Sequence, residues 1–259
     1  MGSRIERSDR RRSVRRTRGA VVTLALLLTA LAAAGPVTAT GSTDANLVGA
    51  ARAWSFAPDS LLTITRLQYE GGGDWYANPS SLPNLLSAIR VRTGLPVSAQ
   101  PETVRPLDPS LKDHPYLYMT GHGNVRFSPE ERVALREHLI AGGFLHADDN
   151  YGMDESFREE LRQIFPDYDF VELPPDHAVF STLYEFPDGL PKIHEHDGEA
   201  PQAFGIFHGG RLMVFYSYES DLGDGWEDED VHDDGPELRE ASLRMGVNLY
   251  LYVLSQLVP

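Results

Sequence analysis

The sequence contains no cysteine among its 259 residues. Disulfide bonds, thiolate nucleophiles, zinc–thiolate sites and lipid anchoring through a cysteine are therefore excluded. A membrane-spanning run is also missing, because the uncharged, mostly apolar run from Ala20 to Ala34 has 15 residues. A helix needs about 20 such residues to cross a bilayer. We therefore expect no stable membrane span once the N-terminal segment has been processed.

Positive charge is scarce beyond the N-terminal segment. Eight of the 23 basic residues and two of the 38 acidic residues lie in the first 34 positions, which leaves 15 basic and 36 acidic side chains and a net charge of −21. Such a surface repels phosphate backbones and anionic headgroups, so nucleic acid is not an expected partner. With 41% hydrophobic residues, the chain suffices for one well-packed domain.

The N-terminal segment has the order of a secretory signal. Eight arginines precede the apolar run, and small residues before Gly35 and Thr40 offer cleavage after Ala34 or Ala39. We expect a periplasmic or extracellular protein. Arg15 and Arg16 leave general secretory and twin-arginine export both open.

Composition divides the chain into three parts. Residues 1–39 are expected to form the signal peptide, and residues 40–60, which are small and polar, a flexible tether. Residues 61–259 then form the folded domain.

Strands and helices alternate along that domain. Period-two alternation or short apolar runs predict strands at 62–69, 116–119, 144–147, 170–173, 203–207 and 211–218. Helical spacing predicts helices at 82–92, 129–140 and 236–257, and another that Asp154 caps. Ser128, Pro129 and Glu131 form the clearest helix start, a capping box with proline at the first helical position. This alternation predicts a mainly parallel sheet covered on both faces, with ligands beyond the carboxyl ends of the strands.

Several motifs occur together in a recognisable order. They are the run 116–123 (YLYMTGHG), 127–132 (FSPEER), 139–149 (LIAGGFLHADD), Asp176-His177 with Phe180, and 211–224, followed by 246–248 (GVN). Together they resemble the domain of unknown function family DUF4159 from residue 61 to the C-terminus. The resemblance implies a class I glutamine amidotransferase-like fold related to the ThuA-like proteins, a flavodoxin-like three-layer α/β sandwich. It does not imply glutamine hydrolysis, because the cysteine nucleophile of that reaction is absent.

Polar residues gather where two predicted strands end. His146, Asp148, Asp149 and Asn150 end one strand, and the Gly121-His122-Gly123 motif ends the preceding one. Carboxylates beside histidine and asparagine hold a divalent cation or polarise a water molecule, which makes His122 and Asp149 the candidate catalytic residues.

The same residues have a structural interpretation that stays open. Acidic residues in such turns cap the next helix, and a histidine between glycines often only closes a tight turn. Strand alternation also sends Asp148 and Asp149 to opposite faces, so at most one is expected to face the cleft. We nevertheless assign Gly121, His122, Gly123 and the Asp148-Asp149-Asn150 run to ligand binding.

An acidic segment runs from Asp221 to Glu237 and contains nine carboxylates in 17 residues. A cation relieves their repulsion, and we expect Asp221 and Asp224, with Asp149, to bind calcium or magnesium. A solvated loop is the other interpretation, favoured for residues 227–234. Trp226 among glycines is expected to offer a stacking surface for a ligand.

Two histidines precede this segment at an i, i+2 spacing. His194 and His196 have the alternation of metal ligands on a strand. Because they lie in a proline- and glycine-rich stretch, we expect solvated loop histidines instead.

Two functions from different classes remain. The favoured one is a non-catalytic envelope protein that binds a small molecule, a glycan or a protein partner in a degenerate amidotransferase-like cleft. The alternative is a divalent-cation-dependent hydrolase of a small molecule or glycan that uses Asp149, His122 and Asp221. The first is preferred because the sequence motifs assemble no set of nucleophile, base and orienting group.

Overall fold

The protein is described by a computed structural model that covers residues 63–194, 196 and 198–257. These residues belong to one unit, residues 49–259. The expected signal peptide and the expected tether, residues 1–60, lie outside the described residues, so those predictions stay predictions.

A seven-stranded sheet forms the centre of the domain, in the order β2-β1-β3-β4-β7-β6-β5. The strands are β1 (Thr65–Leu67), β2 (Glu102–Val104), β3 (Tyr116–Gly121), β4 (Phe144–Asp149), β5 (Val171–Glu172), β6 (Gln202–His208) and β7 (Arg211–Tyr218). β2, β1, β3, β4 and β7 pair in parallel, whereas β6 pairs antiparallel with both β7 and β5. The predicted mainly parallel sheet is confirmed.

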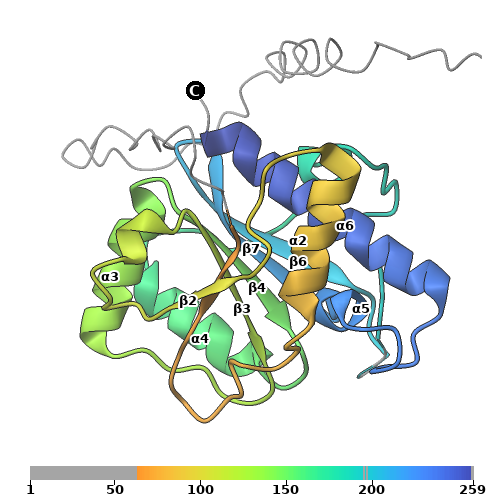
Figure 1. The fold of residues 1–259 in the computed structure, drawn as a ribbon. Coiled ribbons are helices and arrows are strands. Elements are labelled where there is room, and N and C mark those ends of the chain that lie inside the picture. Colours follow the sequence, from red (N-terminus) through yellow and green to blue (C-terminus); the bar gives the residue numbers. More distant parts are fainter. Residues whose placement is uncertain (1–62, 195, 197, 258–259) are drawn as a thin grey trace, which may run out of the picture. The chain divides into compact units, whose positions relative to one another are not determined.

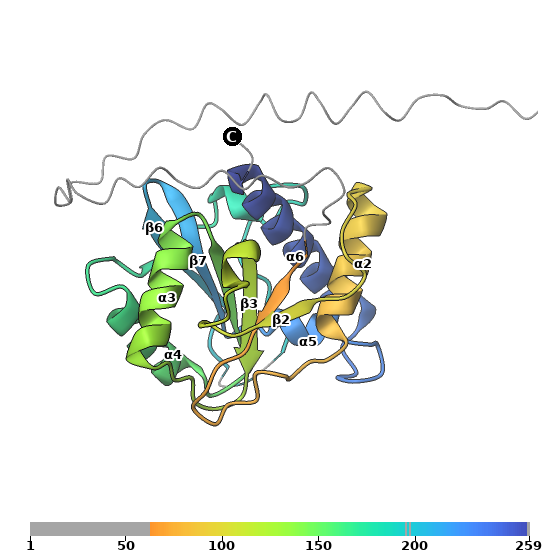
Figure 2. The ribbon, with the colours of Figure 1, turned by 60° about the vertical axis from the view of Figure 1, so that its left-hand side comes forward.

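Helices cover both faces of the sheet. They are α2 (Ser81–Thr93), α3 (Pro129–Ile140), α4 (Asp154–Ile164), α5 (Leu222–Trp226) and α6 (Pro236–Leu257), with 3-10 turns η1 (Leu111–Asp113) and η2 (Ala178–Phe180). Figures 1 and 2 show α3 and α4 on one face, and α2, α5 and α6 on the other. The domain is thus a three-layer α/β sandwich.

Each face has its own apolar core. On one face Leu117, Leu145 and Val214 of the strands pack with Leu135 of α3 and Phe157 of α4. On the other face the core includes residues of α2, α5 and α6. Every residue of β3 and β4 is buried, which fixes the central strands between the two helical layers.

The helix starts test the sequence rules directly. Ser128 accepts a hydrogen bond from the Glu131 amide, and the Glu131 side chain accepts one from the Ser128 amide, so the predicted capping box of α3 is confirmed. The predicted cap of α4 is wrong. Asp154 is already helical, and its Oδ1 accepts hydrogen bonds from Arg158 and Tyr216.

Two elements were not expected. β2 is a three-residue edge strand, too short for its pattern to be recognised. α5 is a five-residue helix inside the segment that was interpreted as a loop. Among the residues that the structure describes, no helix is both long and apolar enough to span a membrane.

Candidate metal centre

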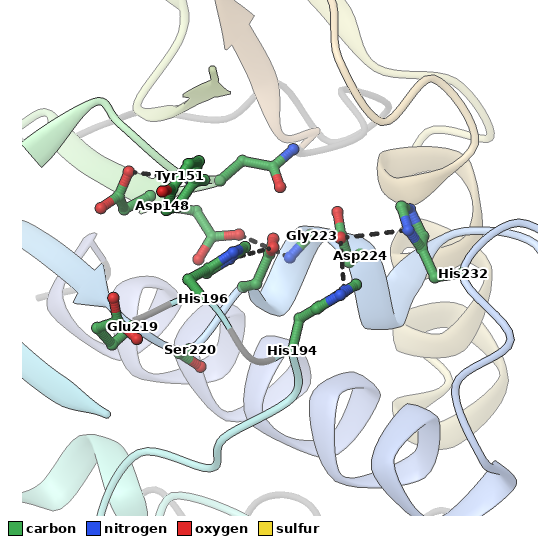
Figure 3. A network of polar contacts seen from close by, with 12 residues as sticks. Asp148, Tyr151, His194, His196, Glu219, Ser220, Gly223, Asp224 and His232 are labelled. Carbon is green, nitrogen blue, oxygen red and sulfur yellow. Dashed lines mark hydrogen bonds and ion pairs between the residues drawn. The ribbon is translucent and has the colours of Figure 1, made fainter. Parts of the chain in front are cut away.

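The site lies beyond the carboxyl ends of β4 and β7, where an open parallel sheet usually binds its ligands. Asn150 follows β4, and Asp221 and Asp224 follow β7. Asn78 comes from the loop between β1 and α2, and His194 from the segment before β6. Figure 3 shows the polar network at this edge.

The chain bends sharply where β7 ends. Glu219 and Asp221 both adopt left-handed backbone conformations, with φ of 55° and 60°. Such conformations are uncommon for residues other than glycine, and they cluster at functional sites. The bend turns the chain into α5, which carries Asp224.

Asp148 fixes the orientation of α5. It is fully buried, and its carboxylate accepts hydrogen bonds from the amides of Leu222 (3.3 Å) and Gly223 (2.6 Å) and from the hydroxyls of Ser217 and Tyr118. Burial raises the pKa of Asp148 to about 7. All four donors belong to the fold, so Asp148 supports the site and is not open to a ligand.

The segment that carries His194 is clamped along the end of β7. The amides of Ile193 and His194 donate to the Ser220 carbonyl at 2.9 and 3.3 Å. Lys192 Nζ lies 2.6 Å from Glu219 Oε2, and this ion pair is largely buried. These contacts bring the His194 ring to α5.

Two histidines and one carboxylate converge on a common point. Nδ1 of His194 and Nδ1 of His232 each lie 3.3 Å from Asp224 Oδ2, and the three residues offer ligand atoms that lie within 4.8 Å of one another. In Figure 3 the Asp224 carboxylate sits between the two rings. His194 Nδ1 is buried and has no hydrogen-bond partner among the described residues. A buried ring nitrogen aimed at a carboxylate oxygen needs a proton or a metal ion between the two.

A second carboxylate, that of Glu227, contacts the other ring nitrogen of His232. His232 Nε2 lies 3.0 Å from Glu227 Oε2, and the other oxygen of Glu227 accepts from the amide and hydroxyl of Ser80. Metal-binding histidines usually donate their other ring N–H to a carboxylate in this way. When Nε2 carries the proton, the lone pair of His232 Nδ1 points at Asp224.

The separations fit a small transition-metal ion. Two ligands of a tetrahedral zinc ion, each bonded at about 2.0–2.1 Å, lie about 3.3–3.4 Å apart. Asp224 is 5% exposed, whereas the side chains of His194 and His232 are 40% and 23% exposed. The two imidazole side chains are thus partly open to solvent, whereas the carboxylate between them is buried.

Beside this cluster is a group of buried oxygens. Asn78, Asn150, Asp221 and Asp224 are all buried, and the Asn78 amide donates to Asp224 Oδ1 at 2.7 Å. Asp221 Oδ2 lies 2.9 Å from His196 Nε2. Burial and the neighbouring carboxylates of Asp224 and Asp148 hold the pKa of Asp221 well above its usual range.

The predicted catalytic residues His122 and Asp149 each contact other groups of the fold. His122 Nδ1 lies 3.1 Å from Asp74 Oδ2 and is half exposed. Asp149 Oδ1 accepts from the amides of Tyr151 and Met153 at 3.2 Å each, which satisfies the N-terminus of α4. Burial raises the pKa of Asp149 to about 6. These contacts agree with the structural interpretation of Asp149 as a helix cap, and its role as a metal ligand with Asp221 and Asp224 stays a prediction.

The glycines and the tryptophan also have structural roles. Gly121 and Gly123 adopt φ of 148° and 84°, and a Cβ at Gly121 would lie 2.3 Å from the Tyr69 hydroxyl. Trp226 is fully buried, and its indole nitrogen donates to the Ser242 carbonyl at 2.9 Å. The expectation of a stacking surface at Trp226 is therefore wrong. It fails because the α5 helix turns the ring inward onto α6.

Sequence reasoning did not select the histidines of this cluster. His194 and His196 were interpreted as solvated, although both rings face buried carboxylates. His232, which lies inside the acidic segment, was not considered as a metal ligand. The combined signal, an i, i+2 histidine pair and a third histidine within a carboxylate-rich segment, is typical of a metal site and was present in the sequence.

The metal-cluster residues do not line either of two surface pockets of the domain. These pockets are lined by residues 106–141 and 175–187. Two of the rings at this edge, Tyr151 and His196, stack with centroids 5.1 Å apart.

Comparison with known proteins adds the family. No curated protein matches the chain. The sequence profile described as "Domain of unknown function (DUF4159)" matches residues 63–254, which is the greater part of the chain and nearly all of the described domain. This protein belongs to the DUF4159 family.

Proposed function

We propose that this chain is an exported, metal-dependent hydrolase in which His194, Asp224 and His232 hold a transition-metal ion of the zinc class. The observation that carries the proposal is the convergence of two ring nitrogens on one buried carboxylate oxygen at 3.3 Å each. Such a set suits zinc and also other first-row ions that accept two imidazoles and a carboxylate.

The ligand set favours a hydrolytic ion over a purely structural one. Structural zinc sites are usually closed by four protein ligands, whereas catalytic sites keep a position for water. Among the described residues, three candidate ligands converge, and two of their side chains are partly exposed. A bound ion lowers the pKa of its water and polarises the scissile carbonyl or phosphoryl group.

The fold supports this placement. We propose a flavodoxin-like, amidotransferase-like arrangement, because the five parallel strands, numbered among themselves in chain order, have the spatial order 2-1-3-4-5, with β6 and β5 added at one edge. The cluster then occupies the edge where this fold class binds ligands. Export, suggested by the N-terminal pattern of residues 1–39, would place the site in the periplasm or outside the cell.

Metal binding is tested by thermal unfolding of the purified, metal-free chain with zinc chloride. An ion that binds only the folded state at a hundredfold excess over Kd adds about 2.7 kcal/mol of stability. For a domain of this size that raises Tm by roughly 5–10 °C. Sodium chloride at equal ionic strength is the reference for diffuse screening.

Three variants make this test specific. His194→Ala and His232→Ala are expected to lose the zinc-dependent rise. His122→Ala, an exposed histidine at the same sheet edge that pairs with Asp74, is the matched control and is expected to keep it. An unchanged Tm of the unmodified chain in zinc, or an equal rise in all three variants, contradicts the proposed metal centre.

Hydrolysis is tested separately on the zinc-loaded chain. We expect turnover of a 4-nitrophenyl carboxylate or phosphate ester that disappears in His232→Ala and after chelation. If zinc binds tightly and neither ester is hydrolysed, the second candidate function is favoured. That candidate is a non-catalytic envelope module for a small molecule, glycan or protein, and the observation in its favour is that neither of the two pockets described above includes a residue of the metal cluster.

A further inference from the structure

The buried oxygens beside the metal centre cannot all be matched with hydrogen-bond donors. Asn78 and Asn150 link the carboxylates of Asp224 and Asp221 through two side-chain amides. Each amide has one donating end and one accepting end. The possible orientations of the two amides can therefore be considered in turn, from one carboxylate to the other.

In one orientation the two amides run head to tail. Asn150 Nδ2 donates to Asn78 Oδ1 at 3.1 Å, and Asn78 Nδ2 donates to Asp224 Oδ1 at 2.7 Å. Asn150 Oδ1 then faces the two carboxylate oxygens of Asp221 at 2.9 and 3.0 Å and Asp224 Oδ1 at 3.2 Å. Among the described residues, this amide oxygen faces only acceptors.

Rotating the amides does not remove the contact between two acceptor oxygens; it moves this contact to another pair of oxygens. With Asn150 reversed, its nitrogen donates to Asp221 and Asp224, but its oxygen meets Asn78 Oδ1 at 3.1 Å. Reversing Asn78 as well places its oxygen 2.7 Å from Asp224 Oδ1. Because two head-to-tail amides between two carboxylates always present one oxygen to an acceptor, a proton or a cation must lie between one pair of facing oxygens.

Burial makes this conflict costly. Asn150 is 2% exposed and Asp221 is fully buried, so bulk water does not separate the facing oxygens. A buried acceptor without a donor costs about 1–3 kcal/mol, and a buried carboxylate costs more. His196 supplies one contact to Asp221 Oδ2, but it leaves the Asn150 oxygen without a donor.

We infer that a second divalent cation binds between Asn150 Oδ1, the Asp221 carboxylate and Asp224 Oδ1, so that Asp224 bridges two ions. The inference rests on the proposed function, because Asp224 Oδ2 is the oxygen that faces His194 and His232. The two oxygens of Asp224 thus face two different clusters, one of ring nitrogens and one of oxygens.

The oxygen spacings agree with those around a small, hard cation. Neighbouring ligands of an octahedral magnesium ion, bonded at about 2.0–2.1 Å, lie about 2.9 Å apart. The separations of 2.9, 3.0 and 3.2 Å between Asn150 and the two carboxylates agree with this value. Hard cations also prefer an all-oxygen site, so magnesium or manganese fits here and zinc fits the histidines. Two ions joined by a carboxylate would bind the attacking water and the leaving oxygen of one ester.

The test uses manganese as a paramagnetic probe of the second site. The metal-free chain is first loaded with one equivalent of zinc and then titrated with manganese chloride, and free manganese is measured by electron paramagnetic resonance. We expect one manganese ion per zinc-loaded chain. Asp221→Asn and Asn150→Leu are expected to keep the zinc and to weaken manganese binding at least tenfold.

A matched control and a second readout separate the explanations. Asp74→Asn removes a carboxylate from the same sheet edge, where it contacts His122, and is expected to bind both ions normally. If zinc binds and no manganese follows, or if Asn150→Leu binds manganese as tightly as the unmodified chain, a proton shared by the carboxylates occupies the position and the inference is wrong. Failure to bind zinc at all contradicts the proposed function itself. Thermal unfolding shows whether each variant is folded. If Asp221→Asn does not fold, a folded Asn150→Leu still tests the inference.

Discussion

His146 makes the domain sensitive to acid, and the effect can be calculated. Its ring is fully buried against Tyr118, Phe215 and Trp226, with centroids 5.2, 5.3 and 5.9 Å away. Nε2 lies 3.0 Å from Ser217 Oγ, and Nδ1 has no hydrogen-bond partner among the described residues. Burial lowers the pKa of His146 from 6.5 to about 3.

The sign of the pH dependence follows from this lowering of the His146 pKa. Between pH 6.5 and about 3 the unfolded chain binds a proton at this histidine and the folded chain does not. Stability is therefore lost as the pH falls through this window, and it is complete above the unfolded pKa. At pH 5 an unfolded pKa of 6.5 gives a loss of about 2 kcal/mol, a figure that depends little on the folded pKa.

The assay is urea unfolding at pH 7.5 and pH 5 for the unmodified chain and for His146→Gln. Glutamine places an amide nitrogen near the position of Nε2, so the contact with Ser217 is retained without a titrating group. We expect the variant to lose about 2 kcal/mol less than the unmodified chain between the two pH values.

The comparison between the two proteins is needed because a neighbouring group acts in the opposite direction. The folded pKa of Asp148 is raised to about 7, so this residue stabilises the folded protein increasingly as the pH falls toward the pKa of Asp148 in the unfolded chain. Asp148 is present in both proteins, so its contribution cancels in the difference. Equal losses in the two proteins would refute the account of His146.

Three further predictions follow from the sequence and the structure. The protein recovered from the envelope or medium is expected to begin at Gly35 or Thr40 by intact mass, and a full-length species as the sole product would contradict export. Asp149→Ala is expected to lower stability by about 1–2 kcal/mol in chemical unfolding, because two amides at the start of α4 lose their acceptor, while His122→Ala changes it little. An equal effect of the two variants would mean that Asp149 is no cap. Arg66→Met is expected to cost at least about 3 kcal/mol and to weaken zinc binding, because the guanidinium donates to the carbonyls of residues 75, 77 and 78 and so holds the loop at the site. Normal stability of this variant in urea would contradict that role.

Local sequence rules predicted much of the fold because the decisive interactions are local. The capping box of Ser128 and Glu131 involves residues three positions apart, and the apolar pattern of α6 gave its bounds, Pro236–Leu257, as they are observed. The strands at 203–207 and 211–218 were predicted from two apolar runs, and they pair as the β6–β7 hairpin around Gly209 and Gly210, which adopt φ of 57° and 81°.

Only part of the candidate site could be predicted, because its contacts join residues that are far apart in the sequence. Asp221 and Asp224 were expected as metal ligands, since charge density is visible in the sequence. The contact of Asp224 with His194 spans 30 positions of the chain and depends on the bend at Glu219 and Asp221, which no local pattern indicates. Asp149 could not be assigned from the sequence, because a carboxylate at a strand end serves a helix cap and a metal site equally well until its amide donors are seen.

The most direct test of the metal centre is a crystal structure of the zinc-loaded chain with data on both sides of the zinc absorption edge. We expect an anomalous peak at about 2.0–2.2 Å from His194 Nδ1, His232 Nδ1 and Asp224 Oδ2. A peak bonded to other residues, or no peak while both rings remain 3.3 Å from Asp224 Oδ2, would contradict the proposed centre.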